Sequence, residues 1–277
     1  MFLRLNVVLL VAFLVLPRVA LAKGGACDIS RIRLPAENKM LSHFGEARLD
    51  QFDREFEVLV WNVLKGDRRP QWDRDMLELG RGADLILLQE GMLNDHMPPI
   101  LRSFDGFLWN FVTSFIFGAD NKHTGVVGGS RVKPLKVLGL RSPGREPILN
   151  SPKTSVVMLF DLADKEEHLL VINIHAINFR LDQPFREHIS QNLAHIRSHQ
   201  GPVIFAGDFN TWNASRTRWL DTQTAQLGLH KIPLRNDNRL LRLDHVYARG
   251  LNWREAALLP HIRSSDHAPI RVRFVVP

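Results

Sequence analysis

The chain has 277 residues, of which 45% are hydrophobic and 23% charged, a balance that supports a sizeable core and excludes overall disorder. Its 36 lysines and arginines outnumber its 29 acidic residues, giving a net charge of +7 and a sequence pI near 10.0. This excess favours polyanionic partners, either nucleic acid or an anionic membrane surface, although no Lys/Arg run is dense enough to define a patch.

The first 22 residues resemble a secretion signal. Arg4 is followed by an apolar run from Val7 to Leu16, then Pro17, then a small-x-small cleavage site at Ala20–Ala22. The run is shorter than the roughly 20 residues that span a bilayer. We therefore expect residues 1–22 to be a signal peptide and the protein to be exported, periplasmic or secreted. The alternative is an uncleaved N-terminal anchor.

Residues 23–50 are poorly periodic and are interpreted as an N-terminal arm, and residues 51–277 are expected to form one domain. Cys27 is the only cysteine. The chain can therefore form neither an internal disulfide nor a cysteine-based metal site. Any metal must be held by carboxylates, amides, histidines or water, which suits Mg²⁺, Mn²⁺ or Ca²⁺.

From about Phe56 onward, short apolar runs rich in β-branched residues alternate with helical or loop segments. The expected strands are 56–61, 84–88, 125–128, 135–138, 155–160, 169–174, 203–206, 243–247, 256–259 and 270–275. The expected helices are 74–81, 93–101, 183–198 and 214–226. Strands outnumber helices and hairpin-like pairs occur, which favours an α+β layered fold over a βαβ repeat. The aromatic stretch 104–117 is interpreted as core and not as a lipid- or base-binding surface.

Polar residues recur at the carboxyl ends of these apolar runs, where ligand sites of open α/β sheets are built. They are Asn62, Glu90, His175, Asp208 and Asn210. Phosphodiester hydrolysis needs a cation on the phosphate oxygens, a base for water and a donor to the developing charge. The pattern supplies these groups, although strands must also end in something polar for purely structural reasons.

Three sets of these residues each have a functional interpretation and a purely structural alternative. Glu90 is a candidate metal ligand, because a buried carboxylate needs a compensating cation; the alternative is a salt-bridged or helix-capping residue. Asp208 and Asn210 can face one side as base and amide donor, or can simply form an Asx turn. Asp244 is expected to bond His267 and fix its tautomer, although Asp266-His267 can also be an ordinary loop pair.

Taken together, these segments resemble the endonuclease/exonuclease/phosphatase superfamily, to which DNase I belongs. The resemblance covers roughly residues 56–276 and rests on ordered short motifs: Asn62, Gln89-Glu90, Gly207-Asp208-Phe209-Asn210, Leu243-Asp244 and Ser265-Asp266-His267. Residues 145–149 and 171–179 are similar to the bacterial YafD-like branch. The resemblance implies a four-layer α/β/β/α sandwich of two mixed β-sheets flanked by helices.

The resemblance also implies residue roles. The metal, Mg²⁺ or else Mn²⁺ or Ca²⁺, is expected on Glu90, Asn62 and Asp266. The expected catalytic residues are His175 at the phosphate or leaving group, Asp208 activating water, Asn210 steadying the transition state, and Asp244 orienting His267. Asn178 and Lys153 are candidate substrate-binding residues, the latter alternatively a solvated lysine.

Three functions compete on this pattern. The first is an exported metal-dependent nuclease, which the basic charge favours. The second is a phospholipid or sphingolipid phosphodiesterase, or a phosphomonoesterase, on the same scaffold. The third is a catalytically inactive binding module, which is disfavoured because every expected polar position is filled. The sequence lacks the motifs that inositol 5-phosphatases carry around these positions, and it indicates no protein partner.

Overall fold

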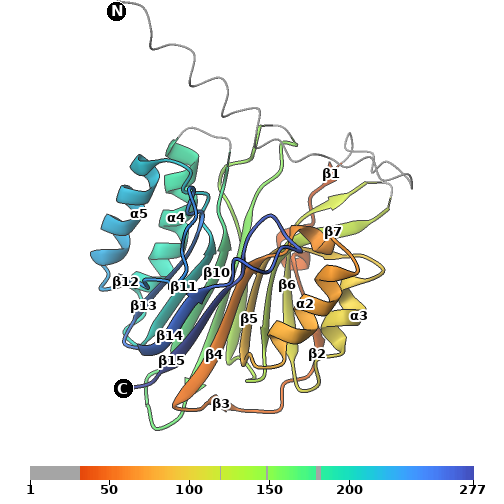
Figure 1. The fold of residues 1–277 in the computed structure, drawn as a ribbon. Coiled ribbons are helices and arrows are strands. Elements are labelled where there is room, and N and C mark those ends of the chain that lie inside the picture. The colour runs from red at the N-terminus through yellow and green to blue at the C-terminus, as the bar shows by residue number, and fades with distance from the viewer. Residues whose placement is uncertain (1–31, 119, 148, 179–181) are drawn as a thin grey trace, which may run out of the picture.

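The computed structural model describes residues 32–118, 120–147, 149–178 and 182–277, so the expected signal peptide and Cys27 lie outside the described residues. Two β-sheets pack face to face, and helices cover their outer faces (Figure 1). Both sheets are mixed: β4–β5 and β10–β11 are parallel pairs, and most other pairs are antiparallel. The expected four-layer sandwich is confirmed. Within the described ranges, no helix is long and apolar enough to cross a membrane.

The larger sheet has eight strands in the order β1-β6-β7-β5-β4-β15-β14, with β2 pairing to β6. Its strands are β1 (Ile32–Arg33), β2 (Leu41–Gly45), β4 (Glu55–Asn62), β5 (Leu85–Leu93), β6 (Leu108–Phe117), β7 (Lys122–Ser130), β14 (Asn252–Leu258) and β15 (Ile270–Val275). Seven strands form the other sheet in the order β12-β13-β11-β10-β9-β3, with β8 pairing to β9. They are β3 (Gln51–Phe52), β8 (Lys136–Arg141), β9 (Thr154–Leu162), β10 (Leu169–His175), β11 (Val203–Asp208), β12 (His230–Lys231) and β13 (Asp244–Arg249).

Within the described ranges, the α-helices lie outside the two sheets and cover both sides of the sandwich (Figure 1). They are α2 (Gln71–Gly80), α3 (Met97–Arg102), α4 (Asp182–Arg197) and α5 (Ala214–Ala225); η1 (Glu37–Lys39) and η2 (Leu64–Gly66) are short 3₁₀ turns. The α5 helix begins where the Asn213 side chain accepts a hydrogen bond from the Arg216 amide, the usual role of an N-cap residue. Helix α4 buries Ile189, Leu193 and Ile196, as its sequence periodicity predicted.

Three hydrophobic clusters correspond to the interfaces between the four layers. One cluster lies between the two sheets and includes Phe56, Val58 and Phe160. The second packs the outer face of the larger sheet against α2 and α3, and the third packs the smaller sheet against α4 and α5. The sandwich is therefore held by apolar burial on both faces of each sheet, which explains why its central strands are continuously apolar.

Several expected boundaries were wrong. The helix expected at 93–101 begins only at Met97, because β5 continues to Leu93. Part of the expected N-terminal arm is ordered sheet, since β2 pairs with β6. The aromatic stretch 104–117 does form core, but mostly as the unpredicted strand β6, in which Trp109 and Phe111 are fully buried.

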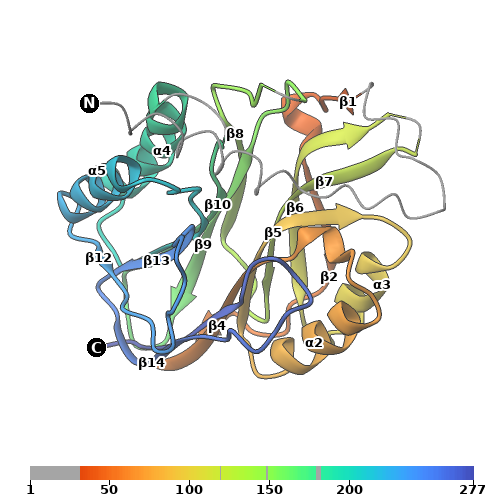
Figure 2. The same cartoon turned by 45° about the horizontal axis from the view of Figure 1, so that its top comes forward.

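The register of the strands places the sequence-predicted residues at one edge of the sandwich. His175 is paired with Asp208, and Asp208 with Asp244, at the ends of β10, β11 and β13. On the other sheet, Asn62 ends β4 and is paired with Gln89 of β5. This edge is the upper one in Figure 1 and comes forward in Figure 2, where loops from both sheets border it.

Candidate active site

Asp208 lies at the centre of the site and is 2% exposed. Its Oδ2 accepts a hydrogen bond from Asn62 Nδ2 across the two sheets at 3.0 Å and lies 3.5 Å from His175 Nε2 and 4.0 Å from His267 Nε2. Its Oδ1 accepts a hydrogen bond from the backbone amide of Asn210 at 2.9 Å. The Asx turn expected as the alternative is therefore present: one carboxylate oxygen closes the turn, and the other faces both histidines.

The backbone around Asp208 requires special residues. Gly207 has φ +137°, and a Cβ there would lie 2.0 Å from the Ile174 carbonyl oxygen, so only glycine fits beside β10. Asn210 has φ +50°, a left-handed conformation that asparagine tolerates. Its Nδ2 donates to the Ala176 carbonyl at 2.9 Å. The side-chain amide of Asn210, to which the resemblance assigns stabilisation of the transition state, is therefore hydrogen-bonded to the neighbouring loop.

His267 and Asp244 form the expected pair. His267 Nδ1 lies 2.9 Å from Asp244 Oδ1 and 3.0 Å from Oδ2. Burial opposes protonation, but Asp244, followed by Asp208 and Asp266, raises the pKa of His267 to about 10. The imidazole is therefore cationic at neutral pH, with its Nε2–H directed toward Asp208. Trp61 Nε1 fixes the backbone by donating to the His267 carbonyl at 2.9 Å.

His175 has the opposite electrostatic character. Burial, with Lys153 as the second cause, lowers its pKa to about 3, against the opposing effects of Asp208 and Glu90. It is therefore a neutral imidazole at physiological pH, capable of donating through one nitrogen and accepting through the other. The site thus places one cationic and one neutral histidine on either side of the same Asp208 carboxylate.

Glu90 does not follow the end of β5 as expected but lies within that strand. The β5–β7 register shifts between Leu88 and Gly91, and Glu90 takes φ +52° in this bulge. Its Oε2 accepts from Lys65 Nζ at 2.6 Å. Burial would raise the pKa of Glu90, but Lys65, assisted by His175 and Lys153, holds it well below its usual value. A strained, ionised carboxylate at a bulge is typical of functional positions.

The other two expected metal ligands are connected to this carboxylate through neighbouring residues: Asn62 pairs in register with Gln89, and Asp266 acts together with Glu90 on the charge of Lys65. Asn62 is buried, and its Oδ1 accepts from the Leu64 amide at 3.2 Å. Asp266 is exposed and accepts from Ser265 Oγ at 3.2 Å, while the same hydroxyl donates to the Asn62 carbonyl at 2.6 Å. Burial opposes the charge of Lys65, but Glu90, followed by Asp67 and Asp266, holds the pKa of Lys65 above its usual value.

Asn178 and Lys153 meet at a shared acidic partner. Lys153 Nζ lies 3.4 Å from Glu146 Oε2, and the Asn178 amide donates to Glu146 Oε1 at 2.9 Å. The solvated-lysine alternative is wrong, because the Lys153 side chain is only 15% exposed. Its charge acts on both His175 and Glu90, so Lys153 belongs to the electrostatic environment of the site.

Two sets of residues fit a cation. Glu90, Asn62 and Asp266 offer the oxygen ligands that hard divalent ions prefer, and Glu90 is already ionised. Asp208, Asp244 and His267 form a second candidate set, whose ligand atoms lie within 4.8 Å of one another. The Glu90 set offers oxygen atoms only, the ligands that Mg²⁺ and Ca²⁺ prefer, whereas the second set includes an imidazole nitrogen.

Sequence reasoning missed several residues that hold the site. Arg239 Nη1 donates to Asp244 Oδ2 at 3.0 Å, and its Nε donates to Asp237 at 2.9 Å. Arg216 is buried and donates to the carbonyls of Asn210 and Ile177. Nothing in the local sequence distinguishes Arg239 or Lys65 from solvated cations. Asn173 did carry a signal, as an amide inside the apolar run of β10.

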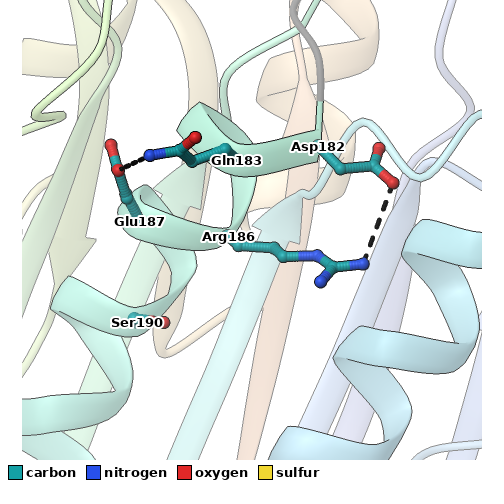
Figure 3. A pocket seen from close by; sticks show the side chains of 5 residues that line it. All are labelled: Asp182, Gln183, Arg186, Glu187 and Ser190. Atoms are coloured by element: carbon teal, nitrogen blue, oxygen red, sulfur yellow. Dashed lines mark hydrogen bonds and ion pairs between the residues drawn. The ribbon is translucent and has the colours of Figure 1, made fainter.

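A cavity of about 420 Å³ lies elsewhere, on the first turns of α4 (Figure 3). Its lining residues satisfy one another: Gln183 Nε2 donates to Glu187 at 2.9 Å, and Arg186 lies 3.9 Å from Asp182. It contains none of the predicted site residues. We therefore place the chemistry at the sheet edge and not in this cavity.

Comparison with known sequences assigns the chain to one family. The sequence model of the Endonuclease/Exonuclease/phosphatase family matches residues 59–267. A UPF0294 protein of Vibrio cholerae serotype O1 is 36% identical over 229 residues, covering 80% of this chain and 78% of its own. A UPF0294 protein of Klebsiella pneumoniae is 34% identical over 238 residues, covering 80% and 83%.

Solved structures share the fold at lower sequence identity. ANGEL2, described as a 2′,3′-cyclic phosphatase, has a TM-score of 0.62 at 16% identity, with 85% of this chain and 98% of that chain covered. A mannosyl-6-phosphatase of Bacteroides thetaiotaomicron has a TM-score of 0.61 at 16% identity, with 79% and 99% covered. At this identity the likeness establishes the fold alone.

Proposed function

The chain belongs to the endonuclease/exonuclease/phosphatase family and, within it, to the UPF0294 proteins, and on this premise we propose that it is a divalent-metal-dependent phosphodiester hydrolase. The observation that carries the proposal is the buried Asp208 carboxylate with two histidines beside it. The neutral His175 lies 3.5 Å from that carboxylate, and the cationic His267 lies 4.0 Å from it. Hydrolysis of a phosphate ester needs a general base for the attacking water and hydrogen-bond donors that stabilise the negative charge developing on the phosphate.

The side chains divide the work by charge state. Asp208 accepts the proton of the attacking water through Oδ2, the oxygen that lies beside both histidines, while the Asn62 side chain and the Asn210 backbone amide hold the carboxylate in place. His267, held by Asp244, presents a charged Nε2–H to the phosphate oxygens. His175 donates from a neutral ring, so it can assist the leaving oxygen without adding a second positive charge. Preorganised donors of this kind stabilise the transition state.

Glu90, Asn62 and Asp266 would hold the metal, which when bound neutralises charge on the phosphate oxygens. Lys65 is the counter-ion that keeps Glu90 ionised, with 2.6 Å between their charged atoms. Lys153 adds a second positive charge at the same side. Anion binding is therefore assigned to the side of the site that carries Glu90 and the two lysines, and proton transfer to the side that carries Asp208.

Phosphodiesters are the proposed substrate class, and the basic charge favours polyanionic substrates, either nucleic acid or an anionic phospholipid surface. Export, periplasmic or beyond, is proposed from the signal-like residues 1–22. The related solved structures include an enzyme named for a 2′,3′-cyclic phosphate, which is itself a diester, and one named for a sugar phosphate, which is a monoester. A phosphomonoesterase is therefore the alternative on the same groups.

The test compares a soluble diester, bis(p-nitrophenyl) phosphate, with the monoester p-nitrophenyl phosphate, using the mature chain with Mg²⁺ or Mn²⁺ and after chelation. We expect diester hydrolysis that chelator abolishes and metal restores, with the monoester slower. Faster monoester hydrolysis would favour the phosphomonoesterase, and activity that survives chelation would exclude the metal role.

Metal binding has a readout besides activity. A ligand that binds only the folded state raises the apparent Tm in proportion to its affinity. Mg²⁺ should therefore raise the Tm of the wild type and have a smaller effect on Glu90→Gln, which keeps the size of the side chain but loses its charge. An equal shift in both proteins would place the metal elsewhere.

A further inference from the structure

Large apolar side chains are exposed beside the site. We define the apolar rim as Trp212, Leu240 and Leu241, whose relative exposures are 44%, 102% and 44%. Across the described ranges, the other exposed large hydrophobic residues are Leu49, Leu135 and Trp253. Half of the exposed large hydrophobic residues of the described chain therefore lie in this rim, and contiguous exposed apolar surface of this kind marks an interaction site.

The rim adjoins the catalytic groups. Beyond the paired Asp208 and Asp244, the two chain segments continue side by side: the Phe209 amide donates to the Leu243 carbonyl at 2.8 Å, and Thr211 Oγ1 donates to the Arg242 carbonyl at 2.7 Å. Trp212 directly follows the first segment, and Leu241 directly precedes the second. The rim therefore continues the β11–β13 ladder outward from the site.

Ion pairs hold the rim in its exposed position. Arg239 binds Asp237 and Asp244, while Arg242 Nε lies 3.3 Å from Asp237, so the residues on both sides of Leu240-Leu241 are tied to one carboxylate. Trp212 is supported from below by the buried Arg216 guanidinium, 5.0 Å from its ring centroid. The leucines are thus presented outward on a braced loop.

The charges around the rim indicate what binds there. Arg242 is 60% exposed beside Leu241, Arg218 is exposed on the first turns of α5, and the only acid within the loop, Asp237, is already shared by two arginines. The whole chain carries +7. Leucine and tryptophan tips flanked by arginines fit a membrane interface, where apolar side chains enter the acyl region and cations remain with anionic headgroups.

We propose that the apolar rim docks the protein on an anionic phospholipid surface and brings headgroup phosphodiesters to the site. The docking step stands on the rim alone, whereas headgroup hydrolysis rests on the proposed phosphodiesterase activity. A nucleic acid would instead use Trp212 for base stacking and would gain little from the fully exposed Leu240.

The test measures binding to sedimented vesicles containing phosphatidylglycerol and phosphatidylcholine, and to vesicles of phosphatidylcholine alone. We expect binding to the anionic vesicles only, and at least about a tenfold loss in the double variant Leu240→Ser/Leu241→Ser, since burial of leucine side chains contributes that much or more to binding. The matched control is Leu49→Ser/Leu135→Ser, which removes two exposed leucines of 45% and 52% exposure outside the rim.

The outcomes separate docking from catalysis. Equal binding of the rim and control variants, or no binding by the wild type, would overturn the docking proposal. Bis(p-nitrophenyl) phosphate hydrolysis should be the same in the rim variant and the wild type, while phosphatidylglycerol hydrolysis falls at least about tenfold. A wild type that binds vesicles but hydrolyses neither diester would leave docking intact and contradict the proposed function. A rim variant that loses binding to single-stranded DNA but not to vesicles would assign the rim to nucleic acid instead.

Discussion

At the scale of single residues, the charge state of His267 depends on one partner. Asp244 contacts Nδ1 with both carboxylate oxygens, at 2.9 and 3.0 Å, and is itself held by Arg239. A raised histidine pKa adds stability that is fully present below the unfolded pKa near 6.5 and is lost as pH rises through about 10. His267 therefore remains charged across the physiological range.

Asp244→Asn keeps the shape of this contact and removes its charge. Burial then acts with less opposition, so the pKa of His267 should fall by more than about one unit, read from its imidazole proton resonances across a pH titration. Phosphodiesterase activity should fall with it, because the donor to the phosphate becomes neutral. An unchanged His267 pKa in this variant would show that Asp244 does not set the charge state.

Residue identity was predictable from sequence where a motif and a strand end coincided. Asp208, Asp244, His175 and His267 all lie where the pattern placed them. Lys65 and Arg239, which tune them, were not predictable, because these residues act through space from segments whose course is set by the whole fold. Lys153 was a candidate from sequence, but its effect on His175 and Glu90 was not. A lone basic residue in sequence carries no sign of which carboxylate it will meet.

At the scale of elements, the bulge in β5 is supported from the opposite sheet. Asn173 of β10 donates to the carbonyls of Leu88 and Val127, both at 2.9 Å, and accepts from Gln89 Nε2 at 2.6 Å. These contacts surround the point where the β5–β7 register shifts and Glu90 turns out of the ladder. One buried amide therefore satisfies the backbone that the bulge exposes.

Asn173→Ala should destabilise both the fold and the bulge. It leaves buried carbonyls unpaired, at about 1–3 kcal/mol for each group, and about 2–4 °C of Tm is lost per kcal/mol in a chain of this size. We expect a clearly lower Tm in calorimetry and a weaker Mg²⁺-induced Tm rise. Asn252→Ala, at an exposed position of β14, is the matched control. A Tm equal to that of the control would contradict this role.

The strand boundaries that sequence reasoning missed have a common physical cause. Polar residues interrupt the apolar run of β6, and polar residues and a glycine interrupt the end of β5. The sequence pattern therefore does not predict a strand in either segment. Tertiary packing decides their state: β6 lies between β2 and β7, and Gly91 and Gly125 are paired where side chains would collide with Val127 and the Val112 carbonyl. The central strands were predictable because both of their faces are buried.

At the scale of the whole molecule, the layered core makes stability sensitive to acid. His188 of α4 is fully buried against the smaller sheet, with Nε2 3.5 Å from Ser155 Oγ. Burial first, and Lys153 second, lower its pKa to about 3. Between pH 6.5 and about 3 the unfolded chain binds a proton that the folded protein does not, so stability falls as pH falls.

His188→Gln should therefore flatten the acid side of the stability profile. The wild type should lose up to roughly 1.4 kcal/mol per pH unit from this residue below pH 6.5, and the variant should lack that slope. Urea unfolding at a series of pH values from 7.5 to 4.5 measures the difference, independently of any change in absolute stability. Parallel profiles would mean that His188 is charged, or solvated, in the folded state.

The four-layer architecture itself was expected from the family resemblance and is confirmed, because an ordered set of short motifs over most of the chain specifies a superfamily more strongly than any single segment does. The substrate was not predictable, because the proposed catalytic groups would contact the phosphate and not what is attached to it. The apolar rim becomes visible only when Trp212 and Leu240-Leu241, 28 residues apart in sequence, are brought together by the β11–β13 ladder.

The most direct test of the central claim is the rate of Mg²⁺-dependent bis(p-nitrophenyl) phosphate hydrolysis by Asp208→Asn, compared with Asp164→Asn. Asp164 is 66% exposed and pairs only with Arg54 among the contacts described for it, so it controls for loss of a carboxylate. We predict that the Asp208 variant loses at least about 100-fold in rate, as loss of a general base requires, and that the control retains wild-type activity. Full activity in a folded Asp208→Asn protein would contradict the account.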